Sequence, residues 1–172
     1  TDSGLTIGYV VELESDDTNS LINESSLSIS GGFGKIVLGE NDGVGDSYGI
    51  GAKDIIAEEA TPAVLSSAIG ANADIAMADG DLNKIAYHLP AMGGLTAGVS
   101  VQDTGTNTGT DTTQYGARYA MALAGDTAVT LGAAVANTSD ATSVDVDSQN
   151  LGVTVVNGSL TLALSQSHTD SV

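Results

Sequence analysis

Apolar and polar residues alternate along most of the chain with a period of two, which indicates β-strands whose two faces meet different environments. In residues 114–123, for example, Tyr115 and every second residue to Leu123 are apolar, whereas Gln114 and Arg118 lie on the opposite face. The alternating segments are residues 5–13, 26–30, 35–38, 84–89, 95–102, 114–123, 129–135, 150–155 and 160–165. The pattern predicts about nine strands and an all-β fold.

Short turns and long polar loops follow one another in strict order between these segments. The short turns are predicted at residues 31–34, 91–94, 124–126 and 157–158, and the long loops at 15–24, 41–82, 103–112 and 137–147. Asn157-Gly158 predicts a two-residue type I′ hairpin turn, because both positions of that turn need positive φ. A meander with short turns at one end and long loops at the other is typical of an antiparallel up-and-down transmembrane β-barrel. A soluble β-sandwich has no such sorting.

Residues 41–82 are the longest stretch without alternation, far beyond the ordinary length of a loop in a compact domain. A helix is predicted over residues 54–60, ending before Pro62, and residues 63–77 are Ala-rich enough for another short turn of helix. The densest group of acidic residues lies in this loop and consists of Asp42, Asp46, Asp54, Glu58 and Glu59.

Composition narrows the classes of function. The 172 residues suffice for one domain, residues 1–172, with 4 basic and 22 acidic side chains and a net charge of -18. This balance argues against nucleic acid as a partner, because binding phosphate needs basic side chains. There is no Cys, and no run of about 18 apolar residues that could form a transmembrane helix. A hydrophobic content of 41% argues against disorder.

The few basic residues have a distinct distribution. Lys35, Lys84 and Arg118 lie on the polar face of predicted strands, and Lys53 lies in the long loop. If the strands form a barrel, the polar face lines its lumen and these three cations point into it. On the apolar face lie four of the five tyrosines, in positions that suit the aromatic girdles of a membrane barrel; they are Tyr9, Tyr87, Tyr115 and Tyr119.

Two stretches resemble a known family. Residues 31–40 read GGFGKIVLGE, a glycine turn around the only Phe followed by a strand, and a Gly- and Asp-rich run follows at 41–46. Residues 83–90 read NKIAYHLP, and residues 93–100 read GGLTAGVS. Both stretches resemble the strands that flank the pore loop in general porins of the Gram-negative outer membrane, especially the alphaproteobacterial type.

The resemblance implies a 16-stranded barrel, a homotrimer among lipid and lipopolysaccharide, and a water-filled channel for passive diffusion of small hydrophilic solutes and ions. It implies that the loop at 41–82 folds inward and that some of its acids face Lys35, Lys84 or Arg118 across a constriction. Because a porin of this kind has about twice as many residues, we expect residues 1–172 to be an incomplete piece, lacking an early strand or two and the C-terminal half.

Other hypotheses stay open. Asp42 and Asp46, among glycines, are weak candidates for a structural calcium site, although their spacing does not match an EF-hand. A secreted, acidic, Gly/Thr-rich β-protein, such as a surface-layer or adhesin module, is the alternative, but no repeat of fixed period is present. No nucleophile–base motif occurs, so an enzyme is not expected. The excess of acids suggests a preference for cations.

Overall fold

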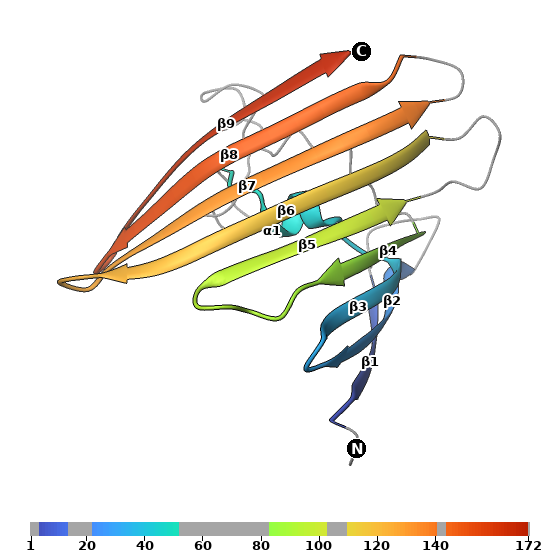
Figure 1. The fold of residues 1–172 in the computed structure, drawn as a ribbon, viewed down its shortest axis with the longest axis horizontal. Helices are drawn as coiled ribbons and strands as arrows, with labels where there is room; N and C mark the ends of the chain where they lie inside the picture. Colours follow the sequence, from blue (N-terminus) through green and yellow to red (C-terminus); the bar gives the residue numbers. More distant parts are fainter. Residues whose placement is uncertain (1–3, 14–21, 52–82, 103–109, 141–143, 172) are drawn as a thin grey trace.

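The structure is a computed structural model, and it describes residues 4–13, 22–51, 83–102, 110–140 and 144–171. In these residues nine strands form one sheet in the order of the sequence, and each strand pairs antiparallel with the next (Figure 1). The strands are β1 (Thr6–Leu13), β2 (Ile22–Gly31), β3 (Gly34–Glu40), β4 (Asn83–His88), β5 (Leu95–Gln102), β6 (Thr110–Leu123), β7 (Thr127–Asp140), β8 (Val146–Asn157) and β9 (Leu160–Ser171). The predicted antiparallel up-and-down meander is confirmed.

Several strands are longer than the alternation predicts. β2 begins at Ile22 rather than at residue 26, β6 begins at Thr110, and β7 continues to Asp140, so the predicted loops at 15–24, 103–112 and 137–147 are too long. The added residues are mostly Thr, Ser, Asn and Asp on both faces. Since alternation is visible only where the two faces differ in polarity, the strand ends beyond the apolar part leave no signal.

The last short turn lies one residue further along the chain than predicted. Asn157 pairs with Leu160 as the final residue of β8, so the two turn residues are Gly158 and Ser159. Only Gly158 has positive φ, at 57°, which is the requirement of a type II′ turn rather than type I′. Asn157 instead uses its side-chain amide to donate to Thr127 Oγ1 at the neighbouring turn.

A water-soluble protein buries its apolar side chains and exposes its polar ones, and the two faces of this sheet show the reverse. On one face, which we call the outer face, large apolar side chains are exposed, including Ile7 at 70% and Leu164 at 74%. On the other, the inner face, polar side chains are buried, including Gln114 at 2% and Asn150 at 1%. The predicted separation into an apolar and a polar face is therefore confirmed, and the apolar face points outward.

A short helix, α1 (Val44–Tyr48), lies on the inner face and contacts β5, β6 and β7 (Figure 1). The sequence does not predict it, because Gly43 and Gly45 make this stretch a poor helix former; contacts with the sheet supply the stability that propensity lacks. The helix predicted over residues 54–60 lies outside the described residues. No helix in the described ranges is long and apolar enough to cross a membrane.

Candidate functional site

The site is the contact between the inner face and residues 44–50, which we call the docked segment. It begins with α1 and continues through Gly49 to Ile50. Val44 and Ile50 have no exposed surface, and Tyr48 is buried too. Val44 is bonded to β5 and Ile50 to β8, so the docked segment crosses four neighbouring strands.

Four glycines form the part of the inner face that lies beneath the docked segment. One lies on each of four consecutive strands, and the register pairs them two by two, β5 with β6 and β7 with β8. They are Gly98, Gly116, Gly132 and Gly152, and we call them the glycine socket.

Side chains at these positions would collide with the docked segment. A Cβ at Gly116 would lie 2.7 Å from the Val44 carbonyl oxygen and 2.8 Å from Tyr48 Cβ. A Cβ at Gly152 would lie 2.5 Å from Ile50 Cβ. Since carbon atoms ordinarily approach to about 3.5–4.0 Å, the docked segment lies closer to the wall than any residue other than glycine allows.

Side chains of β5 and β6 bind the start of α1. The Val44 N–H donates to Ser100 Oγ at 3.1 Å, and the Gly45 N–H donates to Gln114 Oε1 at 2.8 Å. The first N–H groups of a helix have no acceptor within it, so both buried side chains supply partners that the helix cannot. Alternation placed these two residues on the polar face but could not indicate this role.

Asn150 on β8 holds the other end of the docked segment. The Ile50 N–H donates to Asn150 Oδ1 at 3.0 Å, and Asn150 Nδ2 donates to the Ile50 carbonyl at 3.1 Å. The amide therefore pairs with the backbone of Ile50 as a neighbouring strand would. Asn150 Nδ2 also donates to Ser167 Oγ at 3.0 Å, which connects the pair to β9.

Arg118 on β6 binds the C-terminal end of α1. Its Nε donates to the Tyr48 carbonyl at 3.0 Å, and its Nη2 donates to the Gly49 carbonyl. The last carbonyls of a helix lack partners within the helix and carry partial negative charge, so a guanidinium stabilises them. Arg118 is thus on the inner face, as predicted, but part of its hydrogen-bonding capacity serves the docked segment.

Tyr48 connects the docked segment to β4 and β5. Its hydroxyl lies 2.8 Å from His88 Nδ1 and donates to the Ala97 carbonyl at 3.3 Å. Burial raises the pKa of Tyr48 above its ordinary value, so the hydroxyl keeps its proton at neutral pH. A bond between Tyr48 and His88 adds to the attachment that Arg118 provides at the same end of α1.

The two predicted lysines lie on the inner face as well. Lys84 on β4 is 4% exposed. Lys35 on β3 is exposed and is the cross-strand neighbour of His88, whose ring contacts Tyr48. The structure thus brings Arg118 into direct contact with the docked segment. Lys35 lies beside His88, which contacts Tyr48 of that segment.

Of the predicted acids, Asp42 is exposed and Asp46 is half-buried in α1. Asp54, Glu58 and Glu59 lie outside the described residues, so their position relative to the three cations stays a prediction. The described part of the chain contains no group of three or more His, Cys, Asp or Glu side chains that could hold a metal ion. The calcium site at Asp42 and Asp46 also stays a prediction.

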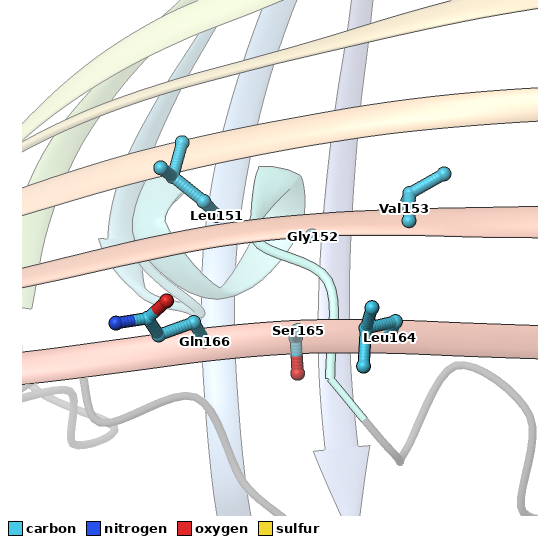
Figure 2. A pocket seen from close by; sticks show the side chains of 6 residues that line it. All are labelled: Leu151, Gly152, Val153, Leu164, Ser165 and Gln166. Carbon is cyan, nitrogen blue, oxygen red and sulfur yellow. The ribbon is translucent and has the colours of Figure 1, made fainter.

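The outer face contains a shallow depression between β8 and β9. Figure 2 shows Leu151 and Val153 of β8 beside Leu164 and Gln166 of β9, with α1 behind the sheet. Toward the long loops the outer face becomes polar, since Gln149, two residues before Leu151, pairs with His168. His168 Nε2 lies 3.0 Å from Asp170 Oδ1, and both side chains are exposed. The apolar surface is therefore a band with a polar margin.

An apolar outward face, a polar inner face and a segment docked against the inner wall are the features of a membrane β-barrel with an inward-folded loop. A family model described as Gram-negative porin matches residues 1–172. The chain belongs to this family and resides in the outer membrane of a Gram-negative bacterium.

A solved structure, the anion-selective porin from Comamonas acidovorans, is similar to the chain at 17% identity and a TM-score of 0.40. The match covers 98% of this chain and 65% of that porin, so the chain spans less than two thirds of its length. No curated protein matches.

Proposed function

We propose that the protein forms a water-filled channel through the outer membrane, for passive diffusion of small hydrophilic solutes and ions. The observation that carries this proposal is the docked segment on the inner face. A polar wall without such a segment would also suit a barrel that only anchors or adheres. A loop attached to the inside of the wall narrows a lumen, which is useful where solutes pass.

The narrow zone lies between the opposite wall and the acidic loop at 41–82, which includes the docked segment. In this proposal Asp42, Asp46, Asp54, Glu58 and Glu59 supply negative charge to the constriction. Lys35, Lys84 and Arg118 supply the positive charge, Arg118 from the wall that the docked segment contacts. Opposite charges across a narrow, low-dielectric passage produce a field that orients dipolar solutes and selects by charge.

The channel prefers cations in this proposal. The net charge of -18 favours them, and two of the three lumen cations have limited contact with solutes. Lys84 is 4% exposed, and Arg118 donates to two carbonyl groups of the docked segment. Lys35 is the exposed one of the three.

Planar-bilayer recording of the purified full-length protein tests the proposal. We expect stepwise conductance increases, and reversal potentials in a salt gradient that indicate cation preference. An anion preference, the property named for the Comamonas acidovorans porin, would contradict the predicted sign but not the channel. A soluble protein that produces no current would support the alternative, a secreted acidic β-protein.

Assembly is part of the same proposal, in which three copies associate in a bilayer whose outer leaflet is lipopolysaccharide. Chemical cross-linking in outer-membrane fragments, followed by electrophoresis without heating, should give a species of three times the monomer mass. A monomer in the cross-linked membrane fragments would refute the trimer.

A further inference from the structure

The structure assigns to the glycine socket and Asn150 the role of setting how far the docked segment projects into the lumen, and therefore the open width of the channel. This inference rests on the proposed channel function. The residues concerned are positioning residues: they touch the docked segment, and no role in contacting solutes is assigned to them.

The docked segment lies too close to the wall for a side chain at the socket positions. At Gly132 a Cβ would lie 2.7 Å from Ile50 Cγ1 and 2.8 Å from the Tyr48 carbonyl oxygen. At Gly152 it would lie 2.5 Å from Ile50 Cβ. Backbone atoms and a Cβ cannot rotate away, so relief requires the whole segment to move. Restoring ordinary contact needs a displacement of about 1 Å away from the wall.

Asn150 attaches the docked segment to the wall, and this attachment is independent of the space that the glycines leave. Asn150 is 1% exposed, and its amide is bonded to both the N–H and the carbonyl of Ile50. A buried amide with both of its polar atoms used on one residue fixes the distance between that residue and the wall. Without it, Ile50 would leave two buried backbone groups without these partners, which is unfavourable.

Together the two features set one quantity, the distance between the docked segment and the wall. The socket permits the docked segment to approach the wall closely, and Asn150 holds it there. Filling the socket should push the segment inward and narrow the channel, whereas removing the amide should let the segment fluctuate. These outcomes differ from a simple loss of stability, which changes the amount of folded protein but not the current through each channel.

The chain offers a matched control for glycine substitution. Gly8 lies on β1 and pairs with Ser28 of β2. A Cβ at Gly8 would lie 2.9 Å from Ser28 Oγ, the end of a side chain that can rotate, and among the described residues no other atom outside its chain neighbours lies within 4 Å. Gly8→Ala therefore introduces the same methyl group into a strand without moving the docked segment.

The test is single-channel conductance of the full-length protein carrying Gly152→Ala, with folding checked by heat-dependent electrophoretic mobility. We expect conductance to fall by roughly a tenth to a half of the wild-type value, and Gly8→Ala to leave it unchanged. Adding Ile50→Gly to Gly152→Ala removes the colliding Cβ and should restore most of the conductance. Folded Gly152→Ala with wild-type conductance, or a double variant without recovery, would overturn the inference.

A second measurement does not depend on current. Amide hydrogen exchange at Ile50, in detergent-solubilised protein, should be at least about tenfold faster in Asn150→Ala than in wild type, and unchanged in Gly8→Ala. Equal exchange in Asn150→Ala and wild type would overturn the inference even if Gly152→Ala does not fold. A wild-type protein that passes no current would instead refute the proposed function, while exchange would still decide whether Asn150 holds the segment.

Discussion

On β7 and β8 the leucines of the outer face are exposed, whereas the glycines next to them on the inner face lie beneath a buried side chain. On the outer face Leu131 and Leu151 are 45% and 64% exposed. On the inner face Gly132 and Gly152, their immediate neighbours in the chain, support Ile50, which has no exposed surface. In a water-soluble protein the leucines would be the core. Here the lipid is the solvent for the apolar face, and the inner contact combines buried apolar side chains of the docked segment with close glycine contacts and polar bonds.

The largest effect is expected from a charge in the apolar band. Leu131→Arg should destabilise the folded barrel by about 2–4 kcal/mol, the cost of Arg near the middle of a bilayer. The measurement is denaturant unfolding in phospholipid vesicles. The matched variant is Thr130→Arg, at the adjacent position on the inner face, which should cost clearly less. Equal stability of Leu131→Arg and wild type would mean that the outer face meets water.

The next largest effect concerns the inner contact. Asn150→Leu keeps a similar volume but leaves the N–H and carbonyl of Ile50 without these partners, and it should cost about 1–3 kcal/mol of unfolding free energy. Ser167→Ala removes only the third bond of Asn150 and is the control, with an expected cost near the lower end of that range. A cost no larger for Asn150→Leu than for Ser167→Ala would show that the amide does not hold Ile50.

A smaller effect is expected from changing the shape of a cation. Arg118→Lys keeps the charge but loses the planar fork that reaches both the Tyr48 and Gly49 carbonyls. We expect a cost of about 1 kcal/mol and noisier open-channel currents, with the reversal potential unchanged. A shifted reversal potential with quiet currents would mean that Arg118 acts on passing ions rather than on the docked segment.

The smallest effect defines the margin of the apolar band. Gln149 lies on the outer face two residues before Leu151, and its neighbour on β9 is His168. Gln149→Arg should cost about 0–1 kcal/mol, since Arg near the membrane interface is tolerated. The same vesicle assay as for Leu131→Arg gives the comparison. Equal costs at the two positions would place Gln149 within the hydrocarbon region and move the margin toward the long loops.

The short turns and long loops predict the strand order, and alternation predicts the separation of the faces and the inner position of Lys35, Lys84 and Arg118. It does so because the two sides of the sheet meet solvents of opposite polarity. It does not predict α1, whose helical conformation depends on bonds from Ser100 and Gln114, 56 and 69 residues away. No local pattern contains such distant partners.

The glycine socket was visible in sequence only indirectly. Gly98, Gly116, Gly132 and Gly152 each lie at an inward position of a predicted strand, which is a signal once the register of the strands is known. An error of one residue in the predicted position of a turn, such as the turn after Asn157, does not remove this signal. What the sequence could not indicate is the occupant, because Ile50 belongs to a stretch with no periodic pattern at all.

The bond between Ile50 and Asn150 joins residues 100 positions apart. The acceptor, Asn150 Oδ1, is not in position until β8 has paired with β7. Contacts between distant residues form late because chain closure is entropically unfavourable. The docked segment therefore reaches its final position only after most of the sheet has assembled. We therefore expect the lumen to be wider while the sheet assembles and to narrow in a late step of folding, when the docked segment binds.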